Sequence, residues 1–85
     1  MLTFEDCLQM CDLSEDEILA IAEHEHLPEI VALELGDHLC HTEGGFDKIR
    51  QFILDDIFFA EESGNLKHAQ ELRAVLKKFN QNHPE

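Results

Sequence analysis

Four residues in the first half of the chain have the types and spacing of a metal site. They are two carboxylates and two imidazoles: Glu34, Asp37, His38 and His41. Spacing of i, i+3, i+4 and i+7 places side chains on one face of a helix. Helical bundles use carboxylate and imidazole groups one turn apart to hold Zn or Fe. A divalent transition metal is therefore one hypothesis for the function.

Glu23 and His26 have the Glu-x-x-His spacing that carboxylate-bridged di-iron bundles use. Leu27 and Pro28 follow immediately, and proline interrupts the amide ladder of a helix. Acids and histidines are frequent in this sequence, so one such pair is expected by chance. We predict a solvated helix end here, and the set within residues 34–41 is the better metal candidate.

The three cysteines predict packing rather than chemistry. Cys7 and Cys11 with Cys40 and His41 are another possible metal set, but Cys7 and Cys11 are spaced more loosely than in a zinc knuckle and lie on an apolar helical stripe. Free cysteine is among the most buried residue types, and an acidic neighbourhood disfavours the reactive thiolate. The sequence has no phosphate-binding glycine loop and no nucleophilic serine motif. We therefore predict no catalytic residue and no enzyme.

The acids are concentrated in the first half of the chain. Residues 1–47 contain thirteen Asp and Glu but no Lys or Arg, whereas residues 48–85 contain six acids and six bases. We predict no binding to nucleic acid or membranes, because both require cationic side chains. A basic protein is the partner that such a surface favours. The candidate partner-binding residues are Glu23, Glu25 and Glu29.

Two further expectations follow from this charge. A DNA-mimic inhibitor of a basic protein is an alternative function, provided that the carboxylates are spaced like phosphates. Glutamates flank His24 and His26 and should favour their protonated forms, so the acidic region is expected to respond to mildly acidic pH. The odd cysteine number and the lack of a signal peptide or membrane segment predict a reduced, cytoplasmic protein.

Helix signals delimit the elements that must position these residues. Ser14 and Glu17 have the spacing of a capping box, Pro28 suits the first position of a helix, and Gly64 suits a helix end. The predicted helices cover about residues 4–11, 15–26, 28–41, 47–62 and 66–81. We predict one all-α domain over residues 1–85, a bundle of four to five short helices. It has an acidic helical part over 1–43 and an antiparallel helical hairpin over 46–82.

Apolar stripes along these helices predict the core and one buried ion pair. In the third helix the stripe is Val31, Leu35 and Leu39. Asp56 and Arg73 lie on the stripes of the two hairpin helices, at similar heights from the turn. A charge against a core needs a partner, so we predict that Asp56 and Arg73 pair and set the hairpin register.

The aromatic residues indicate self-association. Phe46, Phe58 and Phe59 provide more aromatic surface than one small core uses, which predicts a homodimer. Taken together, the sequence predicts a small acidic, non-catalytic interaction or regulatory module without a cofactor. Metal binding through histidine and carboxylate ligands is the alternative.

Overall fold

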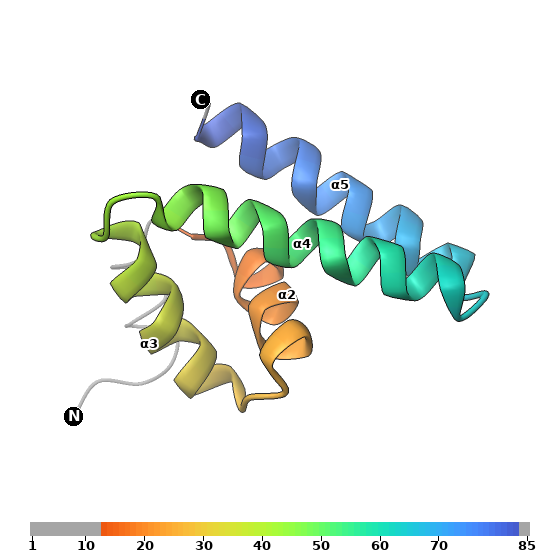
Figure 1. Cartoon of the computed structure of the whole chain (residues 1–85), viewed down its shortest axis with the longest axis horizontal. Helices are drawn as coiled ribbons and strands as arrows, with labels where there is room; N and C mark the ends of the chain where they lie inside the picture. The colour runs from red at the N-terminus through yellow and green to blue at the C-terminus, as the bar shows by residue number, and fades with distance from the viewer. Residues whose placement is uncertain (1–12, 84–85) are drawn as a thin grey trace.

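A computed structural model describes residues 13–83 of the chain. These residues form four α-helices and no strand, which confirms the all-α prediction (Figure 1). The helices are α2 (Glu15–Glu25), α3 (Glu29–Cys40), α4 (Gly45–Glu62) and α5 (Leu66–Asn82). The helix predicted over residues 4–11 lies outside the described residues. No helix within residues 13–83 is both long and apolar enough to span a membrane.

The ends of α2 follow from local sequence signals. The Ser14 hydroxyl accepts a hydrogen bond from the Glu17 amide at 3.3 Å, and the Ser14 amide donates to Oε1 of Glu17 at 2.7 Å. This is the predicted capping box. At the other end of α2, the C-cap residue His26 has a φ of 56°. Pro28 is the N-cap of α3, whereas the sequence predicts it as the first residue of that helix. A left-handed residue is a common helix terminator, and glycine is the usual choice.

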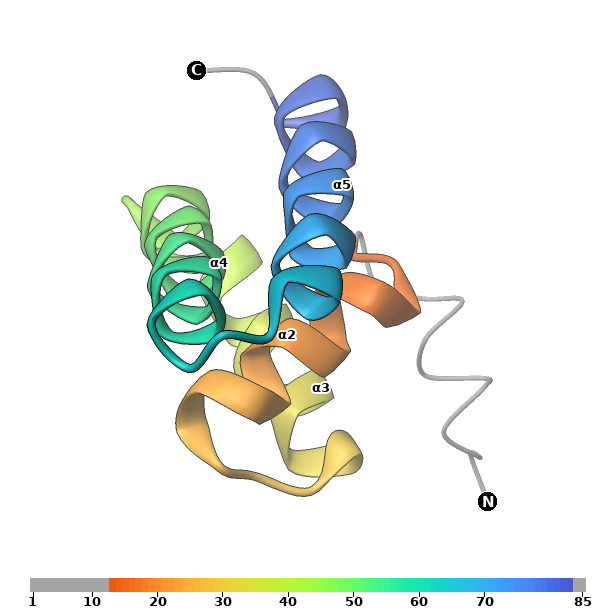
Figure 2. The ribbon, with the colours of Figure 1, turned by 90° about the vertical axis from the view of Figure 1, so that its right-hand side faces the viewer.

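The helices α4 and α5 lie along each other after a short turn at residues 63–65 (Figure 1). Asn65 caps α5, because its Oδ1 accepts a hydrogen bond from the amide of His68 at 3.3 Å. The helices α2 and α3 lie on one side of this pair, and α2 contacts all three other helices (Figure 2). The end of α2 is therefore brought to the face of α4 and to the start of α5.

The core draws on all four helices. It contains Leu13, Ile18, Ala20 and Ile21, then Ala32, Leu33 and Leu39, then Ile49, Phe52, Ile53, Ile57 and Ala60, and finally Ala69, Leu72 and Phe79. The stripe predicted on α3 was partly wrong: Leu39 is buried and Leu35 packs half-buried against the core, but Val31 is 39% exposed. The buried face of α3 instead carries the small residues Ala32 and Gly36. A Cβ on Gly36 would lie only 2.7 Å from Cδ1 of Leu13, so the absence of a side chain there allows the close packing. Helix α3 therefore turns the face with Ala32 and Gly36 toward α2.

The prediction that Asp56 and Arg73 form an ion pair is also wrong. Arg73 lies on the surface and pairs with Glu61 instead. Asp56 is buried, and its Oδ2 has no hydrogen-bond partner. A guanidinium that reaches a surface carboxylate keeps its hydration, whereas it would lose that hydration beside Asp56.

Another arginine connects the two long helices. Nε of Arg50 donates to Oδ1 of Asn80 at 2.7 Å, and Nη2 donates to the carbonyl of His83 at 2.9 Å. The guanidinium also lies over the ring of Phe79, 5.3 Å from its centroid. Arg50 therefore joins the start of α4 to the end of α5, at the opposite end of the pair from the turn.

Candidate functional site

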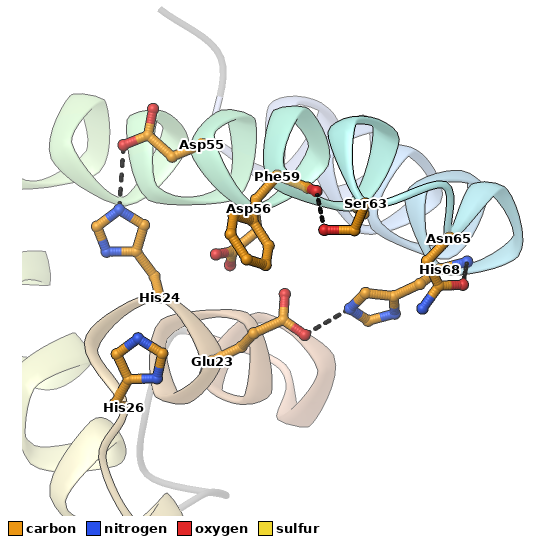
Figure 3. Close-up of a pocket in the computed structure, with 10 residues that line it drawn as sticks. Glu23, His24, His26, Asp55, Asp56, Phe59, Ser63, Asn65 and His68 are labelled. Atoms are coloured by element: carbon orange, nitrogen blue, oxygen red, sulfur yellow. Dashed lines mark hydrogen bonds and ion pairs between the residues drawn. The ribbon is translucent and has the colours of Figure 1, made fainter.

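A pocket of about 400 Å³ lies between the end of α2, the second half of α4 and the start of α5 (Figure 3). Three imidazoles and three carboxylates surround it, together with one exposed aromatic ring. The lining residues are Glu23, His24, His26, Asp55, Asp56, Phe59, Ala60, Ser63, Asn65 and His68. The packing of α2 against α4 and α5 brings them together.

Asp56 is the buried acid of this pocket. It is 6% exposed, its Oδ2 has no hydrogen-bond partner, and Figure 3 shows its carboxyl group between His24 and Glu23. Burial, followed by repulsion from Glu23, raises the pKa of Asp56 to about 7, while the nearby His24 and His68 act in the opposite direction. Asp56 therefore changes its charge near neutral pH rather than in the acidic range.

Two imidazole–carboxylate pairs form the rim of the pocket. Nε2 of His24 lies 3.0 Å from Oδ2 of Asp55, which joins α2 to α4. Nε2 of His68 bonds Oε1 of Glu23, which joins α5 to α2. Asp55 also accepts a hydrogen bond from Gln51 at 2.8 Å, and this bond, followed by that of His24, lowers the pKa of Asp55. Asp55 therefore keeps its negative charge beside the pocket.

The residues predicted as metal ligands on α3 do not converge. All four are exposed: Glu34, Asp37, His38 and His41. Nδ1 of His41 lies 2.8 Å from the carbonyl of Asp37, so this imidazole contacts its own helix. Within residues 13–83 no group of three or more His, Cys, Asp or Glu is placed to hold a metal ion. Side chains on one straight helix stand about 5–6 Å apart at Cβ, and the groups that would complete a shell must come from another helix.

The second proposed metal pair has a different arrangement. Glu23 and His26 both line the pocket, but Glu23 bonds His68, and His26 occupies the left-handed position that ends α2. The expectation that His26 lies at a helix end is thus confirmed. Cys40 packs partly buried against the core, as expected, whereas Cys7 and Cys11 lie outside the described residues.

The predicted partner-binding acids are at the surface around the α2–α3 junction. Glu23, Glu25 and Glu29 are exposed, and Oε1 of Glu25 lies 3.5 Å from Nδ1 of His24. Within the described range, the arginine–carboxylate ion pairs are Arg50–Asp47 and Arg73–Glu61. Neither pair involves an acid of residues 15–43. Among the described residues, Lys and Arg therefore form no ion pair with these acids, although the imidazole of His68 contacts Glu23.

Several pocket residues were not predicted from the sequence. Asp55 and Phe59 come from α4 and His68 comes from α5. No sequence motif links these three residues to the acids of α2. The one available signal was the position of Asp56 on an apolar stripe, which indicated a buried charge but not the pocket beside it.

Comparisons of the chain with protein-family models, with curated proteins and with solved structures found no match.

The chemistry available in the pocket is the binding of a cation and the exchange of a proton. Its serine hydroxyl is engaged, because Oγ of Ser63 donates to the carbonyl of Phe59 at 2.8 Å. The imidazoles of His24 and His68 already contact carboxylates. What remains is the buried carboxyl group of Asp56, together with the exposed imidazole of His26 and the exposed phenyl ring of Phe59.

Proposed function

We propose that the protein is a small non-catalytic module that binds a basic protein through the surface at the α2–α3 junction. The observation that carries this proposal is the set of carboxylates between residues 15 and 43 that form no ion pair with Lys or Arg in the described part of the chain. Clustered carboxylates repel each other and destabilise the free fold. A cationic partner relieves that repulsion, so binding and stability are coupled.

The arrangement of the pocket supports binding rather than catalysis. Nucleophilic catalysis needs a base within hydrogen-bond reach of a nucleophile. The hydroxyl of Ser63 instead donates to a backbone carbonyl, and the imidazoles of His24 and His68 contact Asp55 and Glu23. These contacts are suited to holding three helices in place around an acidic surface.

A capture experiment with a matched pair of charge variants tests this function. The full chain is immobilised, a cell extract is applied at about 50 mM and about 300 mM salt, and the retained proteins are identified. One variant carries Glu→Gln at Glu23, Glu25 and Glu29. The control carries the same change at Glu61, Glu62 and Glu71, so both lose equal charge.

We expect the native chain to retain basic proteins at low salt and lose most of them at high salt. The variant at the α2–α3 junction should lose them at low salt as well, because the ionic contacts are then absent. The control variant should retain them. Equal retention by both variants, or retention of proteins without a basic character, would contradict the proposal.

Self-association is a second candidate, favoured by exposed rings on α4. Phe58 is 65% exposed and Phe59 is 72% exposed, and Leu54 lies one turn from Phe58. Phe46, the third ring of the predicted aromatic surface, is instead half-buried and stacks on His83. Light scattering across a concentration series tests this candidate. A dimer through α4 should dissociate on Phe58→Gln, whereas a monomer at all concentrations would refute it.

A further inference from the structure

We propose that the pocket between α2, α4 and α5 receives the side-chain ammonium group of a lysine from the basic partner, with Asp56 as its buried counter-ion. This inference rests on the proposed function, because it names the group of the partner that the acidic surface recognises. The lysine–Asp56 ion pair would be one specific contact within an interface whose other contacts are long-range attractions between opposite charges.

The burial of Asp56 is the first argument. Buried polar groups in folded proteins are nearly always hydrogen-bonded, and exceptions need an explanation. Oδ2 of Asp56 is such an exception, and the residue is 6% exposed. Arg73, the partner that the sequence predicted, pairs with Glu61 on the surface. Asp56 lines the pocket, so a group that enters the pocket can approach its carboxyl group.

The charges around Asp56 select a cation. Glu23 and Asp55 line the same pocket, and both are carboxylates. The imidazoles of His24 and His68 contact Asp55 and Glu23 respectively. An anion entering the pocket would meet three acids, whereas a cation would be attracted by all of them.

A lysine fits this arrangement better than a metal ion or an arginine. Within residues 13–83 no group of three or more candidate ligands is placed for a metal. Arginine pairs best with both oxygens of one carboxylate, through its planar fork. An ammonium group is a compact charge with three donors that can be shared between separate oxygens. Asp56 and Glu23 present such separate oxygens, from α4 and α2.

The phenyl ring of Phe59 provides the apolar part of the site. It is 72% exposed and lines the same pocket as Asp56. A lysine buries its methylene stem along apolar surface while its charged end seeks a polar partner. The face of an aromatic ring also attracts an ammonium group. Phe59 thus gives the lysine stem a surface that a small inorganic cation would not use.

Acid should weaken the binding. The pKa of Asp56 is raised to about 7, so the carboxyl group loses its charge as the pH falls through that value. The groups that face it are Glu23 and His24 from α2, Asp55 from α4 and His68 from α5. Binding of an ammonium group, in turn, should lower the pKa of Asp56.

The probe is a short blocked peptide, acetyl-Ala-Ala-Lys-Ala-Ala-amide, titrated into the full chain and followed by NMR. The comparison peptides carry acetyl-lysine or arginine at the central position, and n-butylamine supplies the same ammonium group without a peptide. We expect saturable shifts at the pocket residues with the lysine peptide. The arginine peptide and n-butylamine should bind more weakly, and the acetyl-lysine peptide should not bind.

Two variants and a matched control localise the binding. Asp56→Asn should weaken it at least about tenfold, as expected when one partner of a buried charge pair is lost. Phe59→Ala, at an exposed position, should weaken it severalfold without disturbing the fold. Asp37→Asn removes the same charge on α3, away from the pocket, and should change affinity less than about twofold. The ¹³C shift of the Asp56 carboxyl should report a lower pKa with the peptide present.

The inference is overturned if the acetyl-lysine peptide binds as well as the lysine peptide, or if Asp56→Asn and Phe59→Ala both leave binding unchanged. Tighter binding of n-butylamine than of the peptide would assign the pocket to a free amine and also overturn it. The proposed function fails separately, when the Glu→Gln variant at the α2–α3 junction keeps its captured proteins. Salt-sensitive capture without peptide binding would refute the lysine pocket alone.

Discussion

Nε2 of His24 lies 3.0 Å from Oδ2 of Asp55, which is half exposed, whereas Asp56, the next residue of α4, is buried. Hydrogen bonds from Gln51 and His24 lower the pKa of Asp55 at the rim of the pocket. Burial raises the pKa of Asp56, the next residue, to about 7. The His24 ring also stacks on Phe52, with 4.3 Å between centroids. One imidazole thus supports the core and the pocket rim together.

Replacement of Asp56 should stabilise the free protein at alkaline pH. The pKa is about 7 in the folded chain and near 3.8 when unfolded, so folding takes up a proton between these values. The free energy of unfolding therefore falls as the pH rises from about 4 to about 7, by on the order of 3–4 kcal/mol for this residue. Asp56→Asn has no such ionisation, so we expect this variant to have a higher free energy of unfolding than the native chain above pH 7.

Urea unfolding between about pH 4 and pH 9 measures this difference. The advantage of Asp56→Asn should disappear near pH 4, where the native carboxyl group is neutral in both states. Asp37→Asn, at an exposed position on α3, serves as the control and should show no comparable trend. If Asp56→Asn proves less stable than the native chain at pH 8, Asp56 has a favourable partner and its burial has been misinterpreted.

Replacement of Asp55 should have the opposite sign and a smaller size. A lowered pKa means that Asp55 contributes stability above its ordinary value of about 3.8, and that this contribution is lost as the pH falls below it. The side chain is 50% exposed, so solvent screening limits the effect to less than about 1 kcal/mol. Asp55→Asn should therefore be slightly destabilised at pH 7 and equal to the native chain near pH 3. A larger loss at pH 3 than at pH 7 would rule out this explanation.

Two adjacent glycines at the start of α4 should respond differently to alanine. A Cβ on Gly45 would lie 1.7 Å from the carbonyl oxygen of Leu39, so the backbone of α3 would have to move. We expect Gly45→Ala to cost about 3 kcal/mol or more. Gly44 has a φ of 77°, and a Cβ added there would meet no atom within 4 Å, so Gly44→Ala should cost only about 1–2 kcal/mol of backbone strain. Thermal unfolding ranks the two, and equal losses would exclude the close approach as the cause.

The two arginines that link α4 to α5 should also differ. Arg50 donates to Asp47, Asn80 and the carbonyl of His83, and its side chain is only 13% exposed. We expect Arg50→Ala to cost roughly 2 kcal/mol, because charged hydrogen bonds to the end of α5 are lost. Arg73→Ala removes a surface pair with Glu61 and should cost less than about 1 kcal/mol. Chemical unfolding measures both losses. A larger loss for Arg73→Ala than for Arg50→Ala would instead support the sequence-based prediction that Arg73 sets the register of α4 and α5.

The helix ends could be predicted because their causes are local. Ser14 and Glu17 form their capping box within one turn, and Gly64 adopts a φ of 78° next to Asn65, the N-cap of α5. The face of α3 could not be predicted in this way. Val31 and Ala32 are both apolar, and the choice between them depended on the approach of α2, which Gly36 permits. Periodicity alone cannot rank two apolar faces of one helix.

The amino-acid sequence by itself determined the helical fold, the helix boundaries after residue 13 to within two residues, and the separation of acids from bases. Each depends on composition or on signals that act within about one helical turn. Only the tertiary structure decided that Asp56 lies unpaired beside a pocket, and that Arg50 rather than Arg73 holds the end of α5. Glu23 and His68, which bond across the rim, are 45 positions apart. Contacts at that separation depend on how the helices pack, and packing follows from the shapes of all core side chains together.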